Sequence, residues 1–346
     1  MSRILLTVMM LGLLPAAWAQ DNPATFGAST ITRVGTTAGQ FLKLGAGARA
    51  IGLGGAFVAE SSDLSALYWN PAGMARMPGR QVQLNHTRYL ADINYNLGAF
   101  STSLGRLGSI GMGILLLDSG NMLVRSEMEP EGTGEQFKVQ NFALQLSYAR
   151  NLTDLFSVGG SIKFVQERIW HSTASTVAFD VGTLFTTPFR RLKLGASMSN
   201  LGPKLRMDGR DILFSEDPSP NVTGTAEIVN AQYRMDNFSL PLIFRVGLAF
   251  NALDDGTHRV MLVSDAAHPN DNAEYINAGA EYVFRDLIAF RAGWRNLFEP
   301  ETEQGLTAGA SLSMRIDRTL RVAIDYAYAD FGRLTETHWF TFNLSF

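Results

Sequence analysis

The sequence predicts an all-β fold, a transmembrane antiparallel β-barrel of about fourteen strands with an N-terminal hatch inside its lumen. Apolar residues alternate with polar or small ones along most of the chain, which indicates strands with two different faces. Most alternating segments have roughly nine to fourteen residues, whereas strands in soluble sheets are shorter. Every second connection between these segments is short, and the two longest connections fall among the others. Bacterial membrane barrels have this pattern of short turns and longer loops.

The composition fits a membrane or all-β protein better than a soluble globular one. Of the 346 residues, 46% are hydrophobic and only 18% are charged, below the value typical of soluble domains, and 33 are glycine. The formal net charge of −3 offers no basic surplus for a phosphate backbone, so nucleic acid is not an expected partner. The chain has no cysteine, which excludes a disulfide framework, a lipidated cysteine and a thiolate metal site.

Residues 1–19 are predicted to be a secretory signal peptide. Arg3 provides a positive start, residues 4–14 are apolar, and Ala17-Trp18-Ala19 forms a cleavage site with small residues on either side. The mature chain is expected to begin at Gln20. Export combined with a membrane barrel predicts the outer membrane of a bacterial cell, with its lipid as the surrounding solvent.

Residues 20–80 do not alternate, and they contain the densest glycine cluster of the chain. A short helix is expected around 62–69. Pro71 disfavours helical backbone at Asn70 and Gly73 permits a positive φ, so the stretch from Asn70 to Gly73 should form a turn that fixes the segment to the inner wall. A segment that precedes the first strand of so wide a barrel is expected to fold inside it as a hatch or plug.

Residues 81–346 are predicted to form the barrel. Its strands are expected near 81–88, 93–104, 108–118, 137–150, 156–169, 175–187, 192–201, 239–252, 258–266, 274–285, 287–297, 305–316, 320–330 and 336–346.

The two faces of the strands are predicted to meet lipid and lumen. Phe290, Leu312 and Ile324 lie on apolar faces, where a charge at the bilayer midplane is expected to destabilise the barrel by roughly 2–4 kcal/mol. Gly293 and Ser311 lie on polar faces, where substitutions are expected to be tolerated.

Charged residues of both signs are expected on the lumen side. We interpret them as ion pairs that fill or wet the lumen, with a selectivity filter as the alternative. They are Lys163, Glu167, Asp180, Lys193, Arg245, Glu281, Arg291, Arg295, Arg315, Arg321 and Asp325.

The connection lengths predict an orientation in which both termini face the periplasm and the connections 119–136 and 202–238 are external loops. The longer loop is either a plain solvated loop or a surface for a protein partner. Its apolar residues mildly favour the partner surface; they are Leu213, Phe214, Val222, Ile228, Val229, Tyr233 and Phe238.

The glycine-rich segment also carries a family resemblance. Residues 38–59, AGQFLKLGAGARAIGLGGAFVA, and residues 63–74, DLSALYWNPAGM, resemble the PorV/PorQ family, which is itself similar to the FadL group of outer-membrane transporters for hydrophobic compounds. The resemblance implies a fourteen-stranded barrel with an N-terminal hatch. The hatch-motif residues are Gly45, Gly47, Arg49, Gly52, Gly54, Gly55, Asp63, Tyr68, Trp69, Asn70, Pro71 and Gly73.

The resemblance further implies a component associated with type IX secretion. Such a protein receives exported cargo by the cargo's C-terminal signal domain and passes it to a surface-attachment machinery. The alternative is a FadL-like conduit for a hydrophobic small molecule. A conduit needs an apolar pocket between hatch and barrel, whereas a shuttle needs an exposed apolar rim that a partner can cover.

No motif supports an enzyme, so neither catalytic residues nor a cofactor is expected. The glycines at 45 and 47 formally fit part of a dinucleotide fingerprint, but the sequence has no alternation of strands and helices to place it. The histidines at 86, 171, 258, 268 and 338 lack metal-ligand spacing.

At the other end of the chain, Phe342, Leu344 and Phe346 are expected to be a signal for the barrel-assembly machinery.

Overall fold

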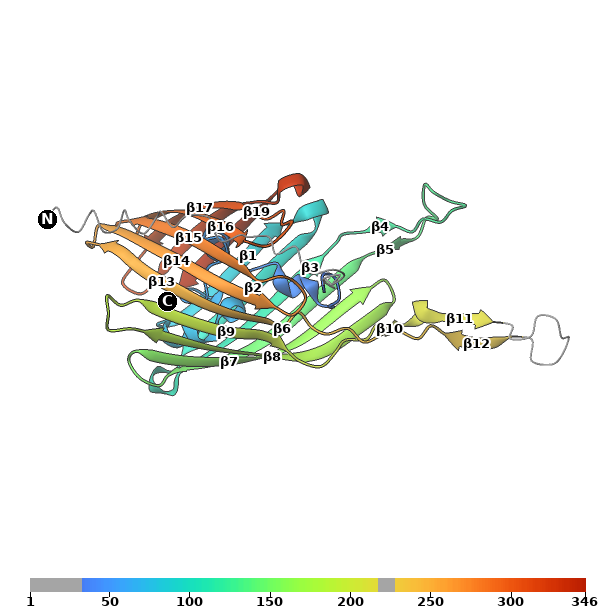
Figure 1. Cartoon of the computed structure of the whole chain (residues 1–346), viewed down its shortest axis with the longest axis horizontal. Helices are drawn as coiled ribbons and strands as arrows, with labels where there is room; N and C mark the ends of the chain where they lie inside the picture. The colour runs from blue at the N-terminus through green and yellow to red at the C-terminus, as the bar shows by residue number, and fades with distance from the viewer. Residues whose placement is uncertain (1–32, 217–227) are drawn as a thin grey trace, which may run out of the picture. The chain divides into compact units, whose positions relative to one another are not determined.

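The computed structural model describes residues 33–216 and 228–346, and the predicted signal peptide therefore lies outside the described residues. Fourteen antiparallel strands close into a barrel in this part of the chain (Figure 1). Closure is complete because the first strand, β1, pairs with β2 on one side and with the last strand, β19, on the other. The fold class predicted from the sequence is therefore confirmed.

All fourteen predicted strands are present, with shifts only at their ends. In chain order they are β1 Arg80–Arg88, β2 Asn94–Ser103, β3 Ser109–Asp118, β6 Val139–Asn151, β7 Phe156–Ile169, β8 Ser172–Thr186, β9 Lys193–Leu201, β13 Ile243–Asp254, β14 His258–Pro269, β15 Tyr275–Phe284, β16 Ile288–Leu297, β17 Leu306–Arg315, β18 Arg321–Asp330 and β19 Glu336–Ser345.

The long connections carry small elements of their own. Between β3 and β6, the strands β4 Met122–Leu123 and β5 Gln136–Phe137 form a hairpin. Between β9 and β13, β11 Leu213–Glu216 pairs with β12 Val229–Gln232, and β10 Asp208–Gly209 pairs with the start of β8. The short 3-10 helices of the connections are η3 Leu90–Asp92, η4 Gly105–Leu107, η5 Arg210–Ile212 and η6 Gly332–Leu334.

The strands have the two faces that the alternation predicts. Phe290, Leu312 and Ile324 point away from the lumen and are 58%, 46% and 54% exposed, whereas their inward-facing neighbours Arg291 and Asp325 are buried. Apolar side chains thus cover the outside of the wall, as expected of a strand-built membrane protein. No helix among the described residues is long and apolar enough to cross a membrane.

Residues 38–77, which we name the plug, lie inside the wall. They form η1 Gln40–Lys43, α2 Ala48–Gly52, α3 Ala66–Trp69 and η2 Pro71–Arg76. Helix α2 packs on β16 to β19, and η2 packs on the opposite arc of β3, β6, β7 and β8. Surrounded in this way, most plug residues between Phe41 and Met74 are buried.

The two ends of the barrel differ. The connections after β2, β6, β8, β13, β15 and β17 are short turns at the end where the chain terminates, and the two long loops lie at the opposite end. Lys43 of the plug forms a 2.9 Å ion pair with Asp271 in the connection after β14, which belongs to the long-loop end. The N-terminus lies outside the described residues, so the expectation that both termini face one side stays a prediction.

Candidate functional site: the plug and the inner wall

Asn70 joins the plug to the wall. Its backbone is extended, as Pro71 requires, and its buried side chain accepts a hydrogen bond from the Ala72 amide at 3.1 Å. Its amide group donates to the carbonyls of Val58 in the plug, at 2.8 Å, and of Thr183 on β8, at 2.9 Å. The prediction that Asn70 fixes the segment to the inner wall is confirmed.

The short helix expected around 62–69 is present as α3, and it ends before Asn70. The residues after Asn70 continue as the 3-10 helix η2, so the conformation predicted for Gly73 was wrong. Gly73 lies within η2 and has no positive φ. It is needed for space instead, because a methyl group there would overlap the carbonyl oxygen of Ser61.

The glycines at 45, 47, 54 and 55 do adopt positive φ, so the dense cluster bends the plug backbone sharply. At Gly54 the same bend brings backbone against backbone. A methyl group on Gly54 would lie 2.7 Å from the carbonyl oxygens of Ala278 and Trp294 in the wall. These turns explain the glycines of the motif without a bound nucleotide.

The inner wall has its own set of glycines where it touches the plug, and sequence reasoning did not find them. A methyl group on any of them would press on plug atoms; they are Gly111, Gly113, Gly159, Gly182, Gly195, Gly247, Gly279, Gly293 and Gly309. The expectation that Gly293 tolerates a side chain is wrong, because its α-carbon faces the backbone of Leu53 and Gly54. Close backbone approach is a common reason for glycine inside a strand.

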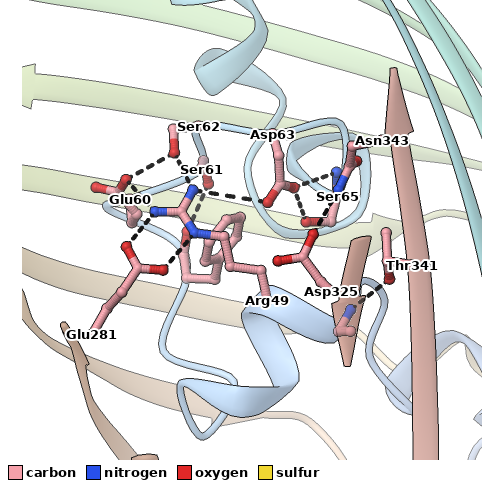
Figure 2. Close-up of polar contacts among 12 residues, drawn as sticks. Arg49, Glu60, Ser61, Ser62, Asp63, Ser65, Glu281, Asp325, Thr341 and Asn343 are labelled. Carbon is pink, nitrogen blue, oxygen red and sulfur yellow. Dashed lines mark hydrogen bonds and ion pairs between the residues drawn. The ribbon is translucent and has the colours of Figure 1, made fainter. Parts of the chain in front are cut away.

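Arg49 of α2 is the centre of an ion-pair network at the short-turn side of the plug (Figure 2). Its guanidinium group donates to both carboxylate oxygens of Glu281 on β15, each at 2.9 Å, and to Glu60 at 3.1 Å. Glu60 also pairs with Lys193 on β9 at 2.7 Å. The network therefore ties two parts of the plug to two strands of the wall.

Wall residues extend this network. Arg291 donates to Glu281 at 2.6 Å and to Asp325 at 2.8 Å. The other Asp325 oxygen accepts a hydrogen bond from Asn343, and near it Thr341 accepts one from the Ala48 amide of the plug, both at 2.8 Å (Figure 2). The interpretation of these lumen charges as ion pairs is confirmed.

Electrostatics within the plug favour the charged forms of Arg49 and Glu60. Burial alone would lower the pKa of Arg49, but Glu281 and Glu60 outweigh it and raise that pKa well above its ordinary value. Burial would raise the pKa of Glu60, yet Lys193 and Arg49 lower it. Asp63 differs, because burial raises its pKa and Arg49 is 3.9 Å away.

A polar cavity of about 440 Å³ lies beside this network. Besides Arg49 and Glu60 it is lined by Ser311 and by strand ends such as Asp254 and Arg321, so it opens toward the short-turn end. Its lining of both charge signs is suited to water and polar groups rather than to an apolar passenger.

The remaining lumen charges fall into different groups. Lys163 pairs with Asp180 at 2.9 Å, and Glu167 accepts a 2.9 Å hydrogen bond from the Gly39 amide. Arg315 and Arg321 are exposed at the short-turn end. Arg245 and Arg295 are buried, and neither forms an ion pair within the described part of the chain.

The aromatic residues of the motif hold the plug together. Trp69 donates its indole N–H to the Ala46 carbonyl at 2.8 Å. The Tyr68 hydroxyl donates to the Leu42 carbonyl at 2.7 Å and accepts from the Gly45 amide at 3.0 Å. Burial raises the pKa of Tyr68 to about 12, so this residue remains a neutral donor at physiological pH.

No three His, Cys, Asp or Glu side chains are placed to hold a metal ion in residues 33–216 and 228–346. The five histidines are scattered around the barrel and have separate hydrogen-bond partners: Asn96 for His86, Asp211 for His171, Tyr282 for His258, Glu274 for His268 and Tyr326 for His338.

The candidate partner residues of the long loop lie at its surface. Leu213, Ile228, Tyr233 and Phe238 are 58%, 72%, 61% and 45% exposed, and the Phe214 ring packs on the Tyr233 ring at 4.6 Å. Val222 lies outside the described residues.

The chain ends at the seam of the barrel. Phe346 and Arg80 exchange backbone hydrogen bonds of 2.9 and 2.7 Å, and Phe342 and Phe346 face outward. Whether this end is a signal for barrel assembly stays a prediction.

Solved structures of bacterial transporters and of a FadL homologue have a fold similar to this plugged barrel. The toluene transporter TodX of Pseudomonas putida shares 14% identity at a TM-score of 0.56, covering 87% of this chain and 96% of TodX. The toluene transporter TbuX of Ralstonia pickettii shares 14% at 0.53, covering 87% and 97%. A Pseudomonas aeruginosa FadL homologue shares 12% at 0.50, covering 85% and 96%.

The sequence itself places the chain more narrowly. Residues 28–216, more than half of the chain, match the family described as type IX secretion system protein PorV. The chain belongs to the PorV family. No curated protein matches it by sequence.

Proposed function

We propose that this outer-membrane barrel is a type IX secretion component that receives exported cargo proteins and passes them to cell-surface attachment. The membership of the PorV family is the observation that carries the proposal. The protein would act by docking partners rather than as an enzyme.

The long loop after β9 supports this proposal, because it offers the exposed apolar rim that a shuttle needs. Ile228 and Tyr233 are largely exposed on or beside strand β12. Exposed aromatic and branched apolar side chains are typical anchors in protein interfaces. We propose that the signal domain of the cargo docks on this rim.

The fold also suggests a second candidate, a conduit for a hydrophobic small molecule, since two similar structures are toluene transporters. The packing of the plug argues against it. Wall glycines allow the plug backbone to contact the wall directly, and the cavity beside the plug is lined by Arg49, Glu60 and Glu281. An apolar passenger needs an apolar pocket at this boundary.

A variant of the rim tests the secretion role. In cells that lack the native copy, Ile228→Asp combined with Tyr233→Asp should reduce surface-displayed cargo about tenfold, because each change places a charge where an apolar anchor binds. Surface cargo is measured by its accessibility to added antibody, and heat-modifiable gel mobility verifies an equal amount of folded barrel.

Leu107→Asp is the matched control, because Leu107 is 68% exposed on η4 at the short-turn end. It should leave cargo display unchanged. Normal display with the double variant, or an equal loss with Leu107→Asp, would contradict docking on the long-loop rim.

A further inference from the structure

Two inward-facing arginines of the wall form no ion pair among the described residues, although Arg245 lies close enough to the buried Asp265 to interact with it electrostatically. Arg245 on β13 is 3% exposed and Arg295 on β16 is 7% exposed. Within the described residues neither pairs with a carboxylate, although Arg291 on the same strand as Arg295 pairs with two. In the described part of the chain, the Nε and Nη1 atoms of Arg295 have no hydrogen-bond partner. A buried guanidinium without a partner is unfavourable, because it loses its hydration and gains nothing in return.

Trp69 of the plug brings the two arginines to one place. The guanidinium carbon of Arg245 lies 5.3 Å from the centre of the Trp69 ring. A methyl group added to Gly55 would lie 3.3 Å from the Trp69 ring and 3.8 Å from Arg295 Nε. Arg245 therefore lies over the indole, and Arg295 lies on its Gly55 side, while the indole N–H is already bonded to Ala46.

Aromatic rings surround this pair of charges. Phe331 lies 6.0 Å from the guanidinium carbon of Arg295 and packs edge-on against Tyr89. Tyr68 packs edge-on against Trp69 and is partly exposed. The cation–π contacts offset part of the desolvation of each arginine, but Nε and Nη1 of Arg295 remain without a partner among the residues that the structure describes.

The pair lies toward the long-loop end of the wall. Arg245 lies near the beginning of β13 and Arg295 near the end of β16, both in the half of the wall next to the long loops. The Arg49 network and its polar cavity occupy the opposite half.

We propose that Arg245 and Arg295 form an oxyanion site that binds the carboxylate or phosphate group of a ligand entering from the long-loop end. The planar guanidinium group presents paired N–H donors that fit the oxygens of either group. The surrounding rings would contact the uncharged part of the ligand. This site is separate from the cargo rim and does not depend on the proposed secretion role.

The experiment measures the unfolding temperature of the full chain in detergent by heat-modifiable gel mobility. Sodium phosphate and sodium benzoate are titrated separately, with sodium chloride holding the ionic strength constant. A ligand that binds only the folded barrel raises its unfolding temperature in a saturable way. We expect such a rise with at least one of the two anions, and the effective anion identifies phosphate or carboxylate as the ligand group.

Arg295→Met and Arg295→Lys make the test specific. The methionine variant should lose the anion-dependent rise, yet without anion it should unfold at the same or a higher temperature than the wild type, because an unpaired buried charge is gone. The lysine variant keeps the charge without the paired donors and should need about tenfold more anion. Arg321→Gln at the short-turn end is the control and should respond like the wild type. No saturable rise in the wild type, or an equal rise in Arg295→Met, would overturn the proposal.

Discussion

Gly293 and Phe290 lie three positions apart on β16 and meet opposite surroundings. Phe290 projects outward, whereas Gly293 touches the plug backbone at Gly54. The alternation of the sequence was sufficient to separate these two faces. It could not show that a small residue on the polar face marks a contact with the plug, because that contact joins segments far apart in the chain. The pairs formed by the lumen charges escaped prediction for the same reason.

These two residues give a prediction at the residue scale. Gly293→Ser should destabilise the barrel by roughly 1–3 kcal/mol through overpacking against Gly54. Phe290→Arg should do so by roughly 2–4 kcal/mol, because it places a charge on the lipid-facing side of the wall. Ser311→Arg points into the polar cavity and should be near neutral. Urea unfolding in lipid vesicles measures all three, and a neutral Gly293→Ser would show that the plug does not contact β16.

At the scale of elements, the plug is the least regular part and was the least predictable in detail. Its location inside the barrel followed from its position before the first strand and its lack of alternation. Its internal structure consists of short helical pieces joined by glycine turns. Such pieces show neither the helical nor the strand periodicity of apolar residues. The sequence could not show that the start of the plug lies at the long-loop end of the barrel. The ion pair between Lys43 and Asp271 that holds it there joins distant residues and leaves no local pattern.

The ionisation of Asp271 makes the stability of the plug at the long-loop end depend on pH. Burial would raise the pKa of its carboxyl, but hydrogen bonds from Thr37, Gln40 and Lys43 outweigh burial and lower the pKa. A lowered folded-state pKa means that Asp271 stabilises the folded plug above the unfolded pKa, about 3.9, and that this stabilisation is lost as pH falls through the folded value.

The comparison with Asp271→Asn measures this effect. The variant should unfold at a lower temperature than the wild type at neutral pH, and the difference should disappear at strongly acidic pH. A difference that persisted unchanged at low pH would show that the charge of Asp271 is not what holds the end of the plug.

At the scale of the whole molecule, fourteen strands and the two unlike ends of the barrel were predictable because each strand carries its own alternation and each connection its own length. The family match supports the proposed secretion role, whereas the fold alone is similar to that of toluene transporters. The two roles differ in one physical requirement. A conduit must move its plug to let a molecule pass, whereas a docking shuttle works with the plug fixed.

Locking the plug to the wall decides between these roles. The chain has no cysteine, so Met74→Cys with Gly111→Cys introduces a single pair, at a place where a methyl group on Gly111 would lie 2.5 Å from the Met74 sulfur. Surface cargo is measured with the disulfide formed and after its reduction, with each single cysteine variant as control. A fixed plug predicts equal cargo display in both states. Loss of display in the oxidised state, restored by reductant, would show that the plug must move and would contradict the docking account.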